Sequence, residues 1–104
     1  MPAMSDTNLQ PRLKPTVKVE RPKLYKVILF NDDFTPREFV MRVLQGEFRL
    51  SEDQAYRVMM TAHRRGVCVV SVYPRDIAET KATRGTEAGM AKGYPLRFGT
   101  EPEE

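Results

Sequence analysis

The side chains best suited to binding or catalysis are a run of three polar residues, Asn31, Asp32 and Asp33, and the only histidine of the chain, His63. Carboxylate oxygens, an amide oxygen and a neutral imidazole nitrogen accept hydrogen bonds, so a site built from them suits a small cation. A phosphate would be repelled by the carboxylates, and no glycine-rich segment is present to hold one. Each residue alone also has a simpler explanation. Asn and Asp commonly form turns by bonding to nearby backbone groups, and a histidine near the end of a helix often borders the core.

Catalysis is a weak candidate for this set of residues. An Asp/His pair can transfer protons, but the candidate nucleophiles Cys68 and Ser71 fall inside a predicted strand, and no motif ties them to the pair. With Cys68 as its single cysteine, the chain cannot form an intrachain disulfide, and no Cys/His spacing resembles a zinc site. We therefore expect a protein that is not an enzyme and that uses neither a cofactor nor a metal.

The polar run lies where a strand gives way to a helix. The segment Leu24–Phe30 is rich in β-formers and nearly continuously apolar, which predicts a central strand. Thr35, Pro36 and Glu38 then supply an N-cap hydroxyl, a proline at the first helical position and a glutamate at the third. This capping box predicts a helix that runs to Gly46 or shortly beyond.

A second helix must carry His63. Ser51 and Gln54 form another capping box, and Gly66 is a good C-terminal stop. The apolar face of this helix consists of residues at helical spacing: Ala55, Val58, Met59 and Ala62. His63 lies at the end of that face. If the two helices form an antiparallel hairpin, His63 faces the polar run at the start of the first helix.

The remainder of the chain predicts two more strands and a third helix. Residues 67–73 are rich in valine and form a strand, and residues 94–98 form a short one, which Pro95 places at an edge. A helix begins between them at Pro74, and three glycines weaken or fray its later half: Gly85, Gly89 and Gly93. The order β-α-α-β-α-β predicts an α+β fold with three helices packed on one face of a small, three-stranded, mostly antiparallel sheet.

Length and composition limit the chain to one small domain. With 104 residues, of which 40% are hydrophobic and 30% charged, a second core would not fit. Residues 1–22 contain four prolines and no apolar period, so we expect a flexible N-terminal extension. Residues 23–100 then form the core, and residues 101–104 form an acidic C-terminal tail. The net charge of +3 is mildly basic, with lysines and arginines spread over the whole chain.

Segments that would direct the chain to a membrane are absent from the sequence. No apolar run approaches the roughly 20 residues that a membrane-spanning helix needs, and the N-terminus lacks the apolar core of a secretion signal. A single cysteine also suits a reducing compartment. We expect a cytoplasmic monomer that binds no membrane.

Four sequence blocks resemble one known family. They are Tyr25–Pro36, which reads Tyr-Lys-Val-Ile-Leu-Phe-Asn-Asp-Asp-Phe-Thr-Pro, followed by Met59–Gly66, Ala78–Lys81 and Tyr94–Leu96. Together they cover roughly residues 24–98 in one register and are similar to ClpS, the adaptor of the bacterial Clp chaperone-protease. The resemblance implies an N-recognin, which binds substrates by a destabilising N-terminal residue and delivers them to the ClpA unfoldase for degradation by ClpAP.

The resemblance also implies roles for individual residues. The substrate's α-amino group is held by residues that match Asn31, Asp33 and His63. The side chain of the first substrate residue enters a pocket whose positions match Leu29, Phe30, Thr35, Arg37, Val40, Met59, Ala62 and Leu96. The family docks to ClpA through the region of the third helix, where the corresponding residues are Asp76 and Lys81. The N-terminal extension is expected to assist substrate delivery.

Two positions depart from the family pattern. Arg37 stands where the family commonly has a methionine that restricts entry to the pocket, and Ala62 stands where it commonly has a valine. The smaller Ala62 enlarges the pocket, and the Arg37 guanidinium can stack on a bound ring. We expect a preference for N-terminal Phe, Tyr and Trp, with weaker acceptance of Leu. In the simpler alternative, Arg37 points to solvent and the selectivity for N-terminal residues is the one usual in the family.

Two other functions stay open at this point. The C-terminal domain of the large-subunit ribosomal stalk protein has a related fold, but nothing in it calls for an Asn-Asp-Asp run with a distant histidine. A small basic nucleic-acid-binding protein is supported only by scattered cations: Arg12, Lys14, Lys18, Arg21 and the Arg64–Arg65 pair. The expected partners are therefore a ClpA-type unfoldase and N-degron peptides, with no nucleic acid.

Overall fold

The computed structural model describes residues 21–104. Six elements follow one another along this part of the chain: β1 (Leu24–Phe30), α2 (Arg37–Gly46), α3 (Glu52–Arg65), β2 (Val67–Pro74), α4 (Arg75–Met90) and β3 (Arg97–Pro102). The predicted β-α-α-β-α-β order is confirmed. Within residues 21–104, none of the helices combines the length and the apolar character that crossing a membrane requires. The predicted N-terminal extension, residues 1–22, falls outside the described residues except for its last two positions.

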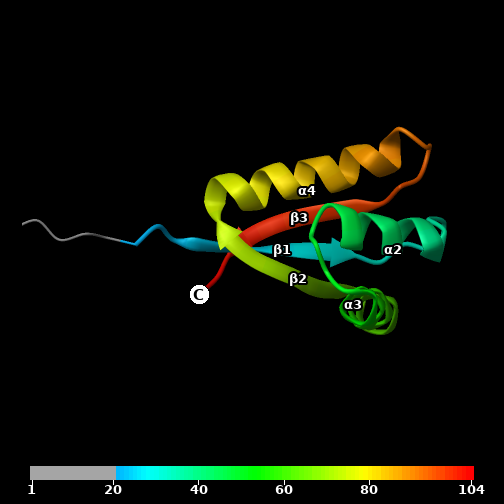
Figure 1. Cartoon of the computed structure of the whole chain (residues 1–104), viewed down its shortest axis with the longest axis horizontal. Helices are drawn as coiled ribbons and strands as arrows, with labels where there is room; N and C mark the ends of the chain where they lie inside the picture. The colour runs from blue at the N-terminus through cyan, green and yellow to red at the C-terminus, as the bar shows by residue number, and fades with distance from the viewer. Residues whose placement is uncertain (1–20) are drawn as a thin grey trace, which may run out of the picture.

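The central strand of the sheet is β1, as predicted, in the strand order β2-β1-β3 (Figure 1). It pairs antiparallel with both neighbours, in a register that sets Leu29 opposite Cys68 on β2 and Phe98 on β3. Along β1 the side chains alternate: Val27 and Leu29 are almost fully buried, while the residues next to them are only partly covered. One face of the sheet therefore carries the core.

The core lies between this face and the helices. Contacts from α4 reach all three strands, while α3 packs mainly on β2, and α2 packs against α3. The α2–α3 pair lies at the end of the sheet where β1 finishes (Figure 1). Buried apolar side chains come from every element and from the segments that connect them: Val27, Leu29, Val40, Val43, Leu44, Phe48, Ala55, Met59, Ala62, Val70, Ala78, Ala82, Leu96 and Phe98.

Both predicted ends of α3 are confirmed. The Ser51 hydroxyl accepts a hydrogen bond from the Gln54 N–H at 3.1 Å, and the Gln54 side-chain oxygen accepts one from the Ser51 N–H at 2.9 Å. At the other end Gly66 adopts a φ of 94°, a left-handed conformation that favours glycine. The chain turns there and enters β2 at the next residue, which fixes where α3 ends relative to the sheet.

The predicted capping box of α2 is wrong. The N-cap residue is Pro36, in an extended conformation, and no side chain caps the helix. The Thr35 hydroxyl instead donates to Asp32 Oδ2 at 2.9 Å, so it belongs to the turn before the helix. The helix begins one residue later than expected, at Arg37, and ends at Gly46 as predicted.

The predicted fraying of α4 is also wrong, because the helix is continuous from Arg75 to Met90. Gly85 and Gly89 are buried inside it. A Cβ atom built on either glycine would fall 2.7 Å from a neighbouring side chain, that of Phe98 or Leu96. The glycines lower the intrinsic stability of the helix, but they let it pack closely against Leu96 and Phe98.

The third strand occupies the predicted edge of the sheet but starts later, at Arg97 rather than at residue 94. The Tyr94 N–H donates to Gly89 O at 2.9 Å, so this part of the backbone completes the turn after α4 and does not join the sheet. Glu101, expected in an acidic tail, lies within β3, with its Oε2 3.8 Å from Lys26 Nζ on β1.

Candidate functional site

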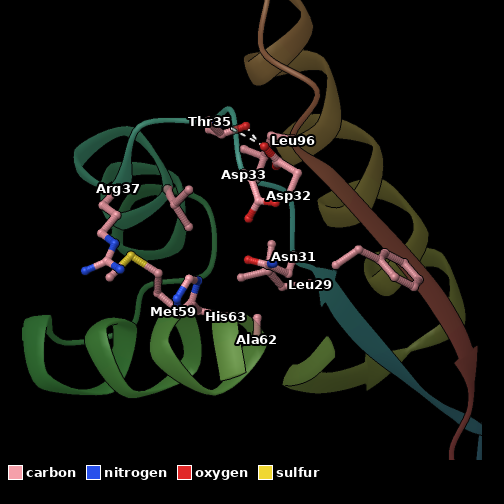
Figure 2. Close-up of a pocket in the computed structure, with 12 residues that line it drawn as sticks. Leu29, Asn31, Asp32, Asp33, Thr35, Arg37, Met59, Ala62, His63 and Leu96 are labelled. Carbon is pink, nitrogen blue, oxygen red and sulfur yellow. Dashed lines mark hydrogen bonds between the residues drawn. The ribbon is translucent and has the colours of Figure 1, made fainter. Parts of the chain in front are cut away.

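A pocket opens at the end of β1, where the chain leaves the sheet for α2 (Figure 2). Its volume is about 220 Å³. The wall residues come from β1 and the loop after it, from α2, from α3 and from the segment before β3: Leu29, Phe30, Asn31, Asp32, Asp33, Thr35, Arg37, Val40, Met59, Ala62, His63 and Leu96. Every residue that the sequence assigned to the amine-binding group or to the side-chain pocket is thus brought to one place, together with Asp32.

The floor of the pocket is apolar and buried. Leu29, Met59, Ala62 and Leu96 each expose 7% of their surface or less, and Val40 exposes 8%. An apolar group that enters such a floor leaves water with a gain of roughly 25 cal/mol per Å² of buried surface. The floor therefore suits one apolar side chain.

The rim of the pocket is polar and exposed. Asn31 and Asp33 lie in the loop after β1, and His63 lies in the last turn of α3 (Figure 2). A backbone hydrogen bond of 2.9 Å, from the Asn31 N–H to Gly66 O, joins the end of β1 to the end of α3. This bond holds side chains that are far apart in the sequence at one opening. His63 therefore lies at the same opening as the polar run, as predicted for an antiparallel pair of helices.

Asp32 is the wall residue to which the family resemblance assigned no role. Its Oδ1 accepts hydrogen bonds from the N–H groups of Phe34 at 2.8 Å and Thr35 at 2.7 Å, and its Oδ2 accepts from the Thr35 hydroxyl. Figure 2 shows Asp32 hydrogen-bonded to Thr35. These bonds fix the turn that presents Asp33. The ordinary turn-forming behaviour of Asp therefore applies to this position, and a threonine three residues later is the signal for it.

Two of the predicted pocket residues, Phe30 and Arg37, line the pocket but are not part of its buried floor. Phe30 lines the pocket, but its ring lies over β3, where the Arg97 Cζ is 4.4 Å from the ring centroid and a Cβ on Gly99 would be 2.9 Å from the ring. Arg37 is the first residue of α2, lines the pocket and is exposed. Arg37 therefore lies between the pocket and solvent, a position from which a guanidinium can reach a bound ring.

The predicted docking residues, Asp76 and Lys81, lie on α4 and do not line this pocket. Asp76 is exposed in the first turn of the helix. Lys81 Nζ donates to Glu47 O at 2.7 Å and lies 3.9 Å from Glu47 Oε2, so it joins α4 to the end of α2. Of the two residues, Asp76 is the one more accessible to a partner.

The side chains of the site suit ligand binding rather than covalent chemistry. Cys68 lies on β2 and is not among the wall residues. Partial burial raises the pKa of its thiol, so little of the reactive thiolate forms at neutral pH. Across residues 21–104, His, Cys, Asp and Glu side chains do not gather in threes as they would to hold a metal ion.

Comparison with known families agrees with this geometry. Residues 20–99 match the family model described as ATP-dependent Clp protease adaptor protein ClpS. The chain belongs to the ClpS family. ClpS adaptor proteins are non-catalytic, as the sequence led us to expect. Of the functions considered from the sequence, the adaptor is the one that this match supports.

Several ClpS proteins match nearly the whole chain. ATP-dependent Clp protease adapter protein ClpS 2 of Mesorhizobium japonicum is 70% identical over 101 residues, which cover 97% of this chain and all of the relative. ClpS 1 of Rhodopseudomonas palustris is 68% identical over 103 residues, with the same coverage of 97% and 100%. The similarity therefore includes all the elements described above.

A solved ClpS structure is also similar. It is described as Agrobacterium tumefaciens ClpS2 bound to L-phenylalaninamide, and it is 65% identical in sequence. The two structures align with a TM-score of 0.78, over 80% of this chain and the whole of the other. L-phenylalaninamide has a free α-amino group and an aromatic side chain.

Proposed function

We propose that this protein is an N-degron adaptor of the bacterial cytoplasm. It binds substrates that carry a free α-amino group and a large hydrophobic first residue, and it delivers them to a ClpA-type unfoldase for degradation by ClpAP. The observation that carries the proposal is the pocket itself, where the acceptor side chains of Asn31, Asp33 and His63 surround a buried apolar floor. The ligand of the similar Agrobacterium structure supports the same assignment of rim and floor.

The rim suits an α-ammonium group. A free α-amino group has a pKa of about 7.7 to 8.0, so most of it is charged at neutral pH and offers three donors. Asp33 supplies a negative charge, and the Asn31 amide oxygen and a neutral His63 nitrogen supply further acceptors. An acetyl cap on the substrate removes the charge and all but one of the donors, so it should abolish recognition.

The floor suits the first side chain of the substrate. A volume of about 220 Å³ is smaller than the roughly 300 to 1,000 Å³ of drug-sized sites, which limits the pocket to one residue. Burying a large apolar side chain contributes about 1.5 to 3 kcal/mol, and each hydrogen bond to the ammonium contributes a similar amount. After the cost of association, we expect micromolar to submicromolar dissociation constants.

Selectivity follows from two wall residues. Ala62 leaves more room in the floor than a valine would, and Arg37 can place its guanidinium on the face of a bound ring. We therefore infer that N-terminal Phe, Tyr and Trp bind more tightly than Leu. Equal dissociation constants for matched Phe and Leu peptides would reject this preference.

Delivery requires a second surface. Asp76 and Lys81 on α4 are the residues we assign to ClpA docking, with Asp76 exposed and Lys81 partly engaged by Glu47. Residues 1–22, with their four prolines, are assigned to the transfer of substrate to the unfoldase. Because Asp76 does not line the pocket, its substitution should impair delivery and leave peptide binding intact.

The proposed function is tested by titrating the protein with a fluorescent peptide that begins with Phe, with the amine free or acetylated. Wild-type protein should bind only the free amine, and His63→Ala should weaken that binding at least tenfold, because it removes one charge-assisted hydrogen bond worth about 1.5 to 3 kcal/mol. Arg64→Ala is the matched control, since Arg64 is the exposed neighbour of His63 and does not line the pocket. Equal binding of the two peptides to wild type would overturn the proposal.

A further inference from the structure

We propose that Gly89 of α4 is a positioning residue, which sets the depth of the pocket through Leu96 and thereby its selectivity among N-terminal side chains. Gly89 is not a wall residue of the pocket. The inference rests on the proposed function, since depth matters only if the floor receives a side chain.

The first observation is the contact between Gly89 and Leu96. Gly89 is buried, and a Cβ atom on it would lie 2.7 Å from Leu96 Cβ and 3.5 Å from Leu96 Cδ2. Non-bonded carbon atoms are normally about 3.5 to 4.0 Å apart. Leu96 therefore rests on the bare backbone of α4, in space that any larger residue at position 89 would take.

The second observation is what lies on the other side of Leu96. Leu96 lines the pocket, is 2% exposed and belongs to the segment that follows α4 (Figure 2). It thus separates the body of α4 from the cavity. A shift of Leu96 away from α4 moves it into the pocket and makes the floor shallower.

Two further contacts fix where the segment before β3 begins relative to α4 and α2. The Tyr94 N–H donates to Gly89 O at 2.9 Å. The Tyr94 ring also packs edge-on against the Phe39 ring of α2, with 5.0 Å between centroids. These contacts anchor Tyr94, two residues before Leu96. The Leu96 Cβ is bonded directly to the backbone and cannot avoid an added methyl by rotating, so Leu96 must shift as a whole, away from α4 and toward the pocket.

Gly85 provides a matched comparison on the same helix. It lies one turn before Gly89, is also buried, and a Cβ on it would be 2.7 Å from two ring atoms of Phe98. Phe98 is a core residue but not a wall residue of this pocket. Alanine at position 85 therefore introduces similar crowding against a residue that does not line the pocket.

The test measures dissociation constants of matched peptides beginning with Trp, Phe or Leu, for wild type, Gly89→Ala and Gly85→Ala, with thermal unfolding recorded for each. In Gly89→Ala, affinity for Trp should fall about tenfold and affinity for Leu no more than about twofold, because overpacking acts on the ligand that fills the floor. Gly85→Ala should keep the wild-type ratio of Trp to Leu affinity. A ratio that is the same in Gly89→Ala and wild type would overturn the inference.

Leu96→Gly and the double variant Gly89→Ala/Leu96→Gly complete the experiment and replace Gly89→Ala if that variant does not fold, because a glycine at position 96 removes the Cβ that the added methyl would strike. A glycine at position 96 has no side chain to reach into the pocket, so the two variants should show the same ratio of Trp to Leu affinity. A double variant with a clearly lower ratio would show that position 89 does not act through the Leu96 side chain, and would overturn the inference. The proposed function fails separately, if wild type binds free and acetylated Phe peptides alike.

Discussion

The rim and the floor of the pocket are built in different ways. The rim combines His63 of α3 with a short loop whose turn is fixed by hydrogen bonds that Asp32 accepts from residues two and three positions away. The floor joins Leu29, Met59 and Leu96, which come from distant parts of the chain and meet only in the folded core. Polar contacts to the α-amino group of a substrate are the same whatever the side chain of its first residue. Changes in the rim should therefore alter all affinities together, and changes in the floor should alter the choice between side chains.

The largest effect is expected for Asp33→Asn, which keeps the shape of the rim and removes its negative charge. Affinity for every free-amine peptide should fall roughly ten- to a hundredfold, the equivalent of about 1.5 to 3 kcal/mol for a charged hydrogen bond. Titrations with Trp, Phe and Leu peptides check this. Asp53→Asn, an exposed change in the first turn of α3, is the control. A loss of affinity confined to one of the three peptides would contradict the separate roles of rim and floor.

A smaller effect is expected for Asp32→Ala, which leaves Asp33 in place and removes the turn that presents it. Two backbone N–H groups and one hydroxyl lose their acceptor, so the free energy of unfolding should fall by about 1 to 3 kcal/mol. Affinity should fall by roughly tenfold at most, equally for Trp, Phe and Leu. Urea unfolding and the same titrations measure both effects. Unchanged stability would show that the turn does not depend on this carboxylate.

The smallest effect is expected for Ala62→Val, which adds two methyl groups to the floor. Affinity for Trp should fall about fivefold, the equivalent of about 1 kcal/mol of overpacking, while affinity for Leu stays within twofold. Ala55→Val makes the same change at a buried position of α3 that does not line the pocket. Its ratio of Trp to Leu affinity should match wild type. If both variants change that ratio equally, general loosening of α3 explains the result better than pocket shape.

Most of the rim could be predicted from the sequence because its signals are local. The apolar run of β1, the Ser51–Gln54 capping box and the stop at Gly66 each act over a few residues, and together they bring His63 to the polar run. The start of α2 could not be predicted from the same kind of signal. The Thr35 hydroxyl suits either a helix cap or the Asp32 turn, and the chain uses it in the turn.

Features that depend on tertiary packing were also predicted wrongly. Helix propensity counts Gly85 and Gly89 as unfavourable, yet α4 is intact because each allows a side chain to pack at close range. The later start of β3 has a related cause, since Tyr94 bonds to Gly89 instead of to β1. Propensity describes a residue in isolation, whereas these positions are decided by what lies opposite.

The hydrogen bond from the Asn31 N–H to Gly66 O has a consequence for motion. A protected amide hydrogen exchanges with solvent when its bond opens. Opening this bond separates the end of β1 from the end of α3, and with them Asn31 from His63. The exchange rate of one amide therefore reports how often the two sides of the rim come apart, and a ligand that bridges them should slow that exchange without touching the Asn31 N–H.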